Sequence, residues 1–273
     1  MTFSLRARQY NKRMLNDKNK KYYVPNVIKT IKILELLAQT PLPLTQKEIS
    51  KHTGYSTSIV FRILTTLEDC EYLAKDENRK YTISKKFAPI SISATSQDDL
   101  IHNSLDILAQ IRDNIMETTM LGVLVDGIFV VILQEQGKYS FSFHCKIGTR
   151  CPLHTGAGSK ALMAFLPEKE RDAIVERMKF EKFNANTITS KTAFKKELAR
   201  IAKCGYALDM EEYIHGMRCV GAPIFNDKNY SIAAVWATGP SDRMAESSLP
   251  EWGAYIAEQA NRISQRLGAT RLK

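Results

Sequence analysis

The sequence has no run of about 18 consecutive apolar residues, the length that indicates a membrane-spanning helix. Its N-terminus also has no apolar core of the kind that a secretory signal peptide carries. The five cysteines are odd in number and scattered, which is not the pattern of a disulfide framework. A chain of 273 residues with 44% hydrophobic residues is long enough to bury the cores of two domains. These features predict a cytoplasmic two-domain protein with reduced thiols and no membrane partner.

The sequence also lacks a complete nucleotide-binding loop. Residues 156–160 read GAGSK and resemble part of such a loop, but the full spacing GxxxxGK[ST] is absent. Helix capping and close packing explain these glycines more simply. Cys219 is a candidate thiol nucleophile with His215 or His154 as its base, yet a buried small apolar side chain is the simpler interpretation. We therefore expect no catalytic residues and no cofactor.

No common zinc-finger spacing is present either. His144, Cys145, Cys151 and His154 include suitable zinc donors, but each of them also fits the interior of a strand or loop. We expect no bound metal ion, although the sequence by itself leaves this group open. The acidic run Asp209, Glu211 and Glu212 is more typical of a solvated turn that orients one ligand-facing side chain than of acid catalysis.

Positive charge is concentrated in the first third of the chain. Residues 1–96 contain 17 Lys and Arg against 8 Asp and Glu, a net charge of +9, whereas residues 97–273 contain 22 against 21, a net charge of +1. A surface that contacts DNA phosphates requires such a positive field, because Lys and Arg gain affinity by releasing counterions. The charge distribution therefore favours double-stranded DNA as the partner of an N-terminal module.

Residues 45–70 have the pattern of two helices joined by a glycine turn. Thr45 and Glu48 fit a capping box, in which the two residues satisfy each other's backbone amides at the start of the first helix. Gly54 can adopt the positive φ of a tight turn. Ser56 is a suitable N-cap for the second helix. The spacing predicts a helix-turn-helix.

The second of these helices has an apolar face and a polar face. Ser58 and Arg62 lie on the polar face, opposite the apolar residues Ile59, Ile63, Leu64 and Leu67. In a DNA-binding helix-turn-helix, the second helix lies in the major groove with its N-terminal residues against the base edges. The alternative is a helical hairpin that serves only as scaffold, and the charge distribution argues against it.

A basic hairpin follows the two helices. Residues 72–75 and 80–83 alternate like strands around the polar tip at 76–79, which is the pattern of a wing. The sequence thus predicts a winged helix-turn-helix. Its candidate DNA-binding residues are Thr45, Ser56, Thr57, Ser58, Arg62, Arg79 and Lys80.

Two segments precede the helix-turn-helix. Residues 1–24 are polar and basic, and we expect a flexible, solvated tail there, with a segment that follows DNA as the alternative. Residues 27–38 predict a helix that builds the core of the module, because apolar residues recur at helical spacing: Val27, Ile28, Ile31, Leu34, Leu37 and Ala38.

The second module mixes helix and strand patterns, beginning with a helix over 98–116. Asp126-Gly127, between predicted strands at 119–125 and 128–133, is a strong signal for a tight hairpin turn. Further strands are predicted at 139–147, 206–210, 218–225 and 231–238, and further helices at 156–166, 168–178, 192–203 and 245–267. Strands flanked by helices in this order predict an α+β domain with a central antiparallel sheet.

Five segments in a fixed order carry a family resemblance. They read VIKTIKILELLAQ, TQKEISKHTGYSTSIVFRILTTLEDCEYL, LHTGAGSKALMAFL, GYALDMEEYIHGMRCVGAPIFND and IAAVWATGPSDRM. Over about residues 24–268 the chain resembles the IclR-type family of bacterial transcriptional regulators. The resemblance implies a winged helix-turn-helix at 25–86, a linker at 87–97 and an effector-binding domain of GAF-like fold at 98–273. It also implies a homodimer or homotetramer on a palindromic operator.

The resemblance also implies an effector site in the second domain. The matching positions are Ala157, Gly158, Asp209, Cys219, Trp236 and Thr238, and Ser159 completes the helix start at which unsatisfied amides can accept a carboxylate. The chain departs from the family pattern at Trp236, where many relatives have a small hydroxylated residue, and at Ile59 in the second helix of the helix-turn-helix. Trp236 would narrow the pocket or stack on a flat ligand. Ile59 would contact a thymine methyl group or pack inward.

We therefore expect a one-component transcriptional regulator that is modulated by a small organic acid, such as a sugar acid or a 2-oxo acid. The alternative is a small-molecule enzyme that carries a winged-helix domain. The two differ in whether the acid changes operator affinity without turnover or is steadily converted. The sequence does not identify the acid or the operator, and it does not show whether the protein represses or activates transcription.

Overall fold

The computed structural model describes residues 22–40, 42–87, 90 and 99–270. The chain divides into two compact units, residues 1–97 and 98–273, each with a hydrophobic core of its own. The predicted tail at 1–24 and the predicted linker at 87–97 fall mostly outside the described residues. Among the helices of the described part, none has the length and apolar character needed to cross a membrane.

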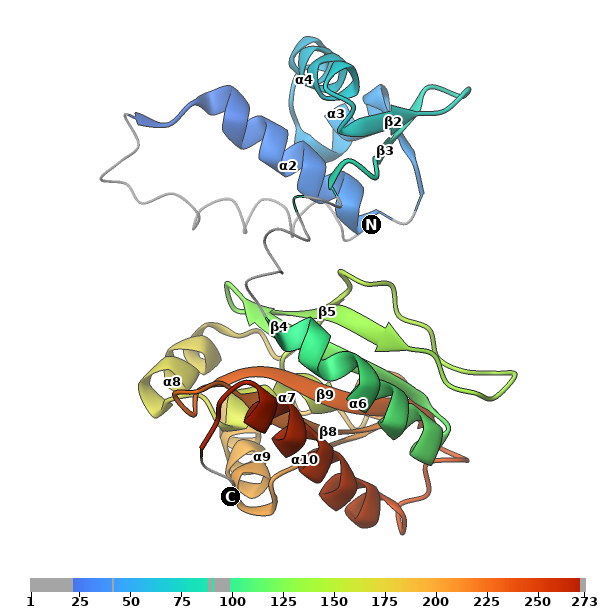
Figure 1. Cartoon of the computed structure of the whole chain (residues 1–273). Helices are drawn as coiled ribbons and strands as arrows, with labels where there is room; N and C mark the ends of the chain where they lie inside the picture. The colour runs from blue at the N-terminus through green and yellow to red at the C-terminus, as the bar shows by residue number, and fades with distance from the viewer. Residues whose placement is uncertain (1–21, 41, 88–89, 91–98, 271–273) are drawn as a thin grey trace. The chain divides into compact units, whose positions relative to one another are not determined.

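In the described residues of unit 1, the helices α2 (Pro25–Gln39), α3 (Gln46–Thr53) and α4 (Thr57–Asp69) pack with a small antiparallel sheet (Figure 1). The strands β1 (Leu44–Thr45), β2 (Leu73–Lys75) and β3 (Lys80–Ile83) form a sheet in the order β1-β3-β2. Ile33, Ile49 and Leu64, one from each helix, are fully buried where the helices meet. The predicted winged helix-turn-helix is therefore confirmed as a fold.

Two helices of unit 1 bury a set of residues that only partly matches the prediction. In α2, Leu37 is buried as predicted, but Val27 is 54% exposed and Ile31 is 48% exposed, and Ile33, which was not predicted, is buried. In α4, Val60 is fully buried and Ile59 is only half-buried. Apolar residues cover more than half of the circumference of each helix, so their spacing predicts a helix but does not decide which stripe meets the core. The packing partners decide that.

Unit 2 is built on a six-stranded antiparallel sheet in the order β6-β5-β4-β9-β8-β7. Its strands are β4 (Thr118–Val125), β5 (Ile128–Glu135), β6 (Arg150–Cys151), β7 (Ala207–Met210), β8 (Met217–Phe225) and β9 (Ser231–Pro240). Its helices are α6 (Asp99–Ile115), α7 (Ala157–Ala164), α8 (Glu168–Arg177), α9 (Lys191–Cys204) and α10 (Leu249–Arg266). The predicted α+β class with a central antiparallel sheet is confirmed. α10 begins four residues later than predicted.

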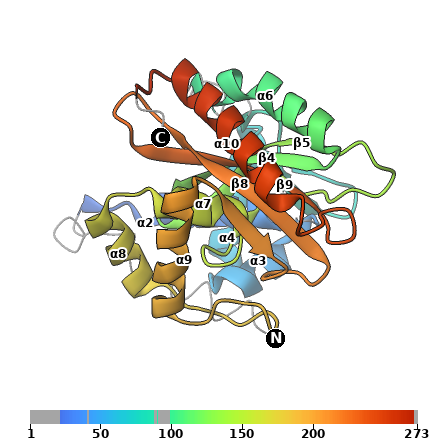
Figure 2. The same cartoon turned by 90° about the horizontal axis from the view of Figure 1, so that it is seen from below.

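The helices of unit 2 cover both faces of this sheet, as Figure 2 shows, with α6 and α10 on one side and α7, α8 and α9 on the other. Alternate residues of each strand point to opposite faces. In β9, Val235 and Ala237 pack under α6 and α10, whereas Ala234 and Trp236 belong to the core under α7. The α7 side of the sheet is the face on which the candidate ligand site lies.

The hairpin between β4 and β5 turns at the predicted place. Asp126 has φ 51° and Gly127 has φ 77°. A two-residue turn with both residues at positive φ matches the twist of the flanking strands, and Asp-Gly is a preferred pair for it. The local prediction is therefore confirmed.

The predicted strand at 139–147 is wrong. This segment runs beside the edge of β5 without a continuous ladder, and side chains form hydrogen bonds with its backbone: the Cys145 amide donates to Gln134 Oε1 at 2.7 Å, and Thr118 Oγ1 donates to the Phe143 carbonyl at 2.6 Å. Phe141 is 65% exposed and Ile147 is 61% exposed. The apolar alternation in the sequence is thus not matched by burial, and only β6, which follows the segment, joins the sheet.

We expect Ile107→Ala in α6 to lower the free energy of unfolding of unit 2 by about 2–5 kcal/mol, because truncating a fully buried aliphatic side chain leaves a cavity. Leu105→Ala removes an aliphatic side chain that is 42% exposed on the same helix and should change stability by less than about 0.5 kcal/mol. Urea titration followed by the fluorescence of the chain's two tryptophans, Trp236 and Trp252, measures both variants. Equal effects would contradict the packing of α6 described above.

Candidate DNA-binding helix and candidate ligand site

The start of α3 is fixed by the predicted capping box. Thr45 Oγ1 accepts from the Glu48 amide at 3.3 Å, and Glu48 Oε2 accepts from the Thr45 amide at 2.8 Å. Gly54 ends α3 with φ 74°. The Thr45 side chain is therefore engaged in capping α3, and its first role is to orient the helix-turn-helix.

The N-terminal half of α4 presents a polar, solvent-exposed surface. Ser56 caps the helix by accepting from the Ile59 amide at 3.4 Å, and Gln46 Nε2 donates to the Thr57 carbonyl at 3.1 Å, which ties α3 to α4. Thr57, Ser58 and Arg62 are exposed. Arg62 forms no ion pair with any residue in the described part of unit 1. These side chains are available to a partner at the helix start, as a DNA-reading helix requires.

Ile59 points partly inward. It packs against the core of unit 1 and lines an apolar groove of about 340 Å³ between α2 and α4, together with Val27, Ile31, Arg62 and Ile63. Of the two possibilities that the sequence left open for this residue, inward packing is the one that the structure shows.

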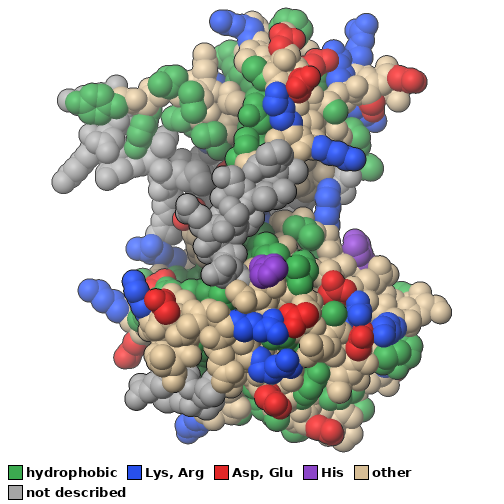
Figure 3. Space-filling model, viewed as in Figure 1, with side chains coloured by type: hydrophobic (Ala, Val, Ile, Leu, Met, Phe, Trp, Pro, Cys, Tyr) green, Lys and Arg blue, Asp and Glu red, His purple; other side chains and the backbone are tan. Residues whose placement is uncertain are grey.

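The wing carries its cations on a tight turn. Asp76 Oδ1 accepts from the Lys80 amide at 2.8 Å, and Arg79 adopts φ 57°. Arg79 is exposed and Lys80 is half-exposed. Figure 3 shows Lys and Arg side chains on the visible face of unit 1, interspersed with carboxylates.

The candidate ligand site lies on the α7 side of the sheet in unit 2. Asp209, Cys219 and Thr238 are cross-strand neighbours in β7, β8 and β9, and all three are buried. Thr238 Oγ1 lies 3.3 Å from Cys219 Sγ, which lies 3.8 Å from Asp209 Oδ2. The structure therefore brings these three predicted residues into one polar row. Asp209 Oδ1 also accepts from the Glu212 amide at 2.7 Å, so this carboxyl holds the turn after β7 as well.

Trp236 fills the space between this sheet face and the start of α7. A Cβ atom on Gly158 would lie 2.5 Å from Trp236 Cε3, and one on Gly221 would lie 2.6 Å from Trp236 Cβ. The Phe129 ring lies 5.5 Å from the Trp236 ring, centroid to centroid. Glycines at 158 and 221 therefore make room for the indole, which occupies much of the predicted ligand site.

The start of α7 has the unsatisfied amides that an anion can use. Gly156 is the N-cap and makes no side-chain cap, so the first amides, those of Ala157, Gly158 and Ser159, are left without an intrahelical acceptor. Ser159 Oγ donates instead to the Gly156 carbonyl at 2.9 Å. The helix has eight residues, and all of them are buried.

Lys160 and Glu212 form a buried ion pair beneath this helix, which the sequence analysis did not predict. Burial raises the pKa of Glu212 to about 7 against the opposing effect of Lys160. Burial likewise raises the pKa of Asp209 to about 6. Both carboxyl groups thus hold a proton more tightly than exposed ones do. A lysine inside the otherwise small and apolar segment GAGSKALMA was the signal that could have revealed this pair.

Two buried polar atoms near α7 lack a hydrogen-bond partner among the described residues. They are Thr155 Oγ1, two residues before the helix, and Glu212 Oε2, on the carboxyl group that pairs with Lys160. An unpartnered buried polar atom costs about 1–3 kcal/mol, so such atoms mark places where a bound polar molecule would be stabilising.

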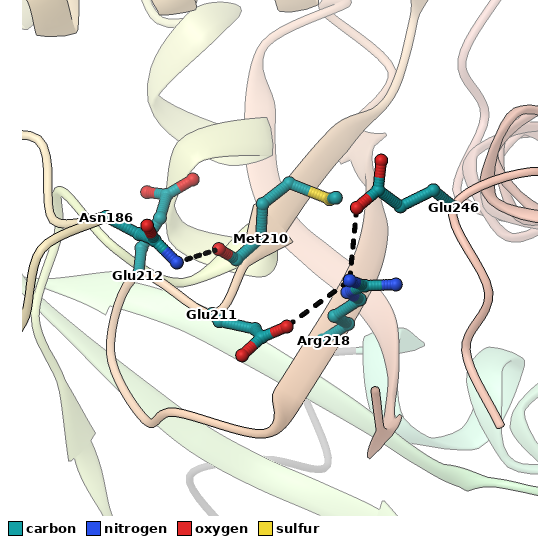
Figure 4. A pocket seen from close by; sticks show the side chains of 6 residues that line it. All are labelled: Asn186, Met210, Glu211, Glu212, Arg218 and Glu246. Atoms are coloured by element: carbon teal, nitrogen blue, oxygen red, sulfur yellow. Dashed lines mark hydrogen bonds and ion pairs between the residues drawn. The ribbon is translucent and has the colours of Figure 1, made fainter. Parts of the chain in front are cut away.

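A separate pocket of about 360 Å³ lies beside the end of β7 (Figure 4). Arg218 lies between Glu211 and Glu246, at 3.3 Å and 3.1 Å from their carboxylate oxygens. The pocket is lined by Asn186, Met210, Glu211, Glu212, Arg218 and Glu246. Three carboxyl groups against one guanidinium disfavour an organic anion here. The predicted solvated turn is wrong for Asp209 and Glu212, which are buried, and Glu211 is only partly exposed and pairs with Arg218.

The two histidines among the four possible zinc donors have other partners. His144 Nδ1 lies 2.8 Å from Gln134 Nε2, and His154 Nε2 lies 2.9 Å from the Glu181 carbonyl. Burial raises the pKa of Cys151 to about 12. No group of three or more His, Cys, Asp or Glu side chains that could hold a metal ion occurs in the part of the chain that the structure describes. Burial also raises the pKa of the Cys219 thiol well above its ordinary value, which disfavours a nucleophilic thiolate.

Comparisons with known proteins agree with both units. Residues 27–77 match the IclR helix-turn-helix domain, and residues 92–265 match the C-terminal domain of the bacterial transcriptional regulator IclR. The chain is 30% identical to the HTH-type transcriptional regulator KdgR of Escherichia coli over 247 residues, which cover 90% of this chain and 93% of KdgR.

Solved structures resemble the whole chain. The Thermotoga maritima IclR structure has a TM-score of 0.71 at 27% identity and covers 90% of this chain and 100% of its own. An IclR homologue from Microbacterium hydrocarbonoxydans, complexed with 4-hydroxybenzoate, has a TM-score of 0.79 at 17% identity, covers 90% of this chain and 100% of its own, and shows the common fold alone.

We expect Gly158→Ala to lower the free energy of unfolding of unit 2 by about 1–3 kcal/mol, because the added methyl group overlaps the Trp236 ring. In a protein that already carries Trp236→Ala, the same substitution should lower the free energy of unfolding far less. Gly156→Ala is the matched control, since the nearest atom to its Cβ is Ser159 Oγ at 3.2 Å. Urea titration followed by circular dichroism gives the coupling between the two sites. A cost for Gly158→Ala that does not depend on Trp236 would contradict the contact.

Proposed function

The chain belongs to the IclR-type family of bacterial transcriptional regulators and is a DNA-binding regulator, and from that premise we propose that it binds a palindromic operator and responds to a small carboxylate. In this proposal residues 25–86 contact the operator and residues 98–273 form the sensor. The observation that carries the operator part is the exposed N-terminal half of α4, which lies in the first third of the chain, residues 1–96, where +9 of the chain's +10 charge is concentrated.

In this proposal α4 reads the base sequence, and both α4 and the wing contact phosphates. Ser58 and Arg62 would face the groove, because both are exposed on the side of α4 opposite its buried residues. Arg79 and Lys80 would add affinity that depends little on sequence and strongly on salt. Thr45 and Ser56 would contribute by fixing the helix starts rather than by side-chain contact alone.

A homodimer or homotetramer follows from the size of the reading surface. One winged helix reads a short half-site, so strong specificity requires a second copy, and a two-fold axis makes the operator palindromic. The proposal therefore includes two copies of α4 on successive turns of one DNA face.

The effector would be a small organic acid bound at the start of α7. The free amides of α7 favour a carboxylate, and Thr238 and the unpartnered Thr155 hydroxyl offer further hydrogen bonds on the same side of the sheet. The structural relative that holds 4-hydroxybenzoate supports this class of ligand. Because Trp236 fills much of the space, the ligand must be small, or the indole must move to stack on a flat acid.

Binding without turnover is favoured over catalysis. The matched relative is a transcriptional regulator, and the buried thiol of Cys219, with its raised pKa, is a poor nucleophile. The enzyme alternative predicts steady conversion of the acid, which chromatography of the incubated ligand would detect.

We expect Arg62→Ala to weaken operator binding by about 5- to 150-fold, the range of a lost base or phosphate contact of about 1–3 kcal/mol. Ser58→Ala should weaken it less, by about fivefold, as for one neutral hydrogen bond. Fluorescence anisotropy at fixed salt measures both, with Lys169→Ala in α8 as the control for loss of an exposed cation. Unchanged affinity in both α4 variants would exclude this helix face from the interface.

We expect Asp209→Ala to weaken binding of the effector at least about fivefold while leaving effector-free operator binding intact, because Asp209 belongs to the polar row in unit 2. Calorimetric titration with 4-hydroxybenzoate, 2-oxo acids and sugar acids first identifies an acid that changes operator affinity; a change of about 1–3 kcal/mol is the usual allosteric scale. Asp227→Ala, at an exposed turn of the same unit, is the control. If that acid binds all three proteins equally, the site is elsewhere.

A further inference from the structure

One large apolar side chain lies on the exposed surface of α4. Phe61 is 54% exposed, although it stands between Val60, which is fully buried, and the cationic Arg62. The hydrophobic core of unit 1, as far as the described residues define it, does not include Phe61. Single exposed apolar residues are common on protein surfaces, so it is the position of Phe61 on α4, and not its exposure alone, that bears on function.

Phe61 lies on the same surface as the polar residues at the start of α4. Residues three and four apart in a helix are neighbours on its surface, so Phe61 adjoins Ser58 and Thr57, and Arg62 follows it directly. All four residues are exposed. The apolar groove between α2 and α4 is lined by Ile59 and Arg62 but not by Phe61, so the ring does not belong to that groove.

The major groove of DNA offers one apolar group to such a ring. Each thymine displays its 5-methyl group there, whereas the other base edges present hydrogen-bond donors and acceptors. Ile59, at which the chain departs from the family pattern and for which this contact was one of two possibilities, is half-buried against the core of unit 1. Phe61 is therefore the apolar side chain of α4 that is free to reach a base.

We propose that Phe61 is a specificity-determining residue whose ring contacts a thymine methyl group in each operator half-site. This inference rests on the proposed operator binding by α4. Contact with one methyl group is worth about fourfold in affinity, the value for burying one such group. The operator half-site consequently contains an A·T pair beside the bases or phosphates that Arg62 contacts.

The test uses the full chain and a duplex that it selects from a random DNA library. Each thymine of the duplex is replaced in turn by deoxyuridine, which removes the methyl group and leaves every hydrogen bond of the base pair. For the wild-type protein, replacing one particular thymine in each half-site should lower the affinity about fourfold. In Phe61→Ala, replacement at that position should have no effect, and Phe61→Leu should keep part of it.

Leu42→Ala is the matched control, because Leu42 is also a strongly exposed apolar residue of unit 1 but lies outside α4. It should retain the full deoxyuridine effect. The contrary result is a wild type that binds its duplex while every deoxyuridine replacement changes its affinity by the same factor as that of Phe61→Ala. In that case the inference about Phe61 is wrong, and the proposed operator binding is unaffected. If Phe61→Ala instead weakens all duplexes alike and shifts the oligomeric state in light scattering, the ring covers another copy of the chain, which also overturns the inference. A wild type that selects no sequence contradicts the proposed operator binding itself.

Discussion

The contact between Trp236 and the start of α7 sets the arrangement of the α7 side of unit 2, where the candidate ligand site lies. The indole rests where Gly158 and Gly221 have no side chains, so α7 approaches the sheet as closely as its backbone allows. That approach places the free amides of α7 over the same sheet face as Asp209, Cys219 and Thr238. A larger residue at either glycine, or a smaller one at position 236, would change the volume left for a ligand.

The buried polar groups on this face have a cost that packing alone does not offset. Lys160 and Glu212 are paired, but taking both out of water is expensive, and one oxygen of Glu212 still has no partner among the described residues. Asp209 holds the turn that follows β7 by accepting from the Glu212 amide, so these buried carboxyl groups and the backbone of that turn are directly connected.

Unit 1 depends on a different constraint, the rigid placement of a short helix. The capping box of Thr45 and Glu48, the left-handed Gly54 and the contact from Gln46 to the Thr57 carbonyl fix α4 from its N-terminal side. The buried residues of α4 hold the helix against the core of unit 1 on its opposite side. Exposed residues on the remaining face, Phe61 and Arg62 among them, therefore keep a defined geometry before any partner binds, which lowers the entropy lost on association.

The sequence by itself determined the features that depend on residues close together in the chain. The capping box, the Asp126-Gly127 turn and the helix end at Gly54 all follow from local backbone preferences, and the structure confirms them. The net charge of the first third of the chain likewise needed no structure.

Only the tertiary structure decided which of several apolar stripes is buried and what fills the candidate ligand site. Residues 139–147 alternate like a strand but do not join the sheet, and α2 buries Ile33 while leaving Val27 and Ile31 exposed. The Lys160–Glu212 pair joins residues 52 positions apart, and Trp236 meets Gly158 across an even longer separation. The physical reason is that burial depends on the partner surface, which distant parts of the chain supply only once it has folded.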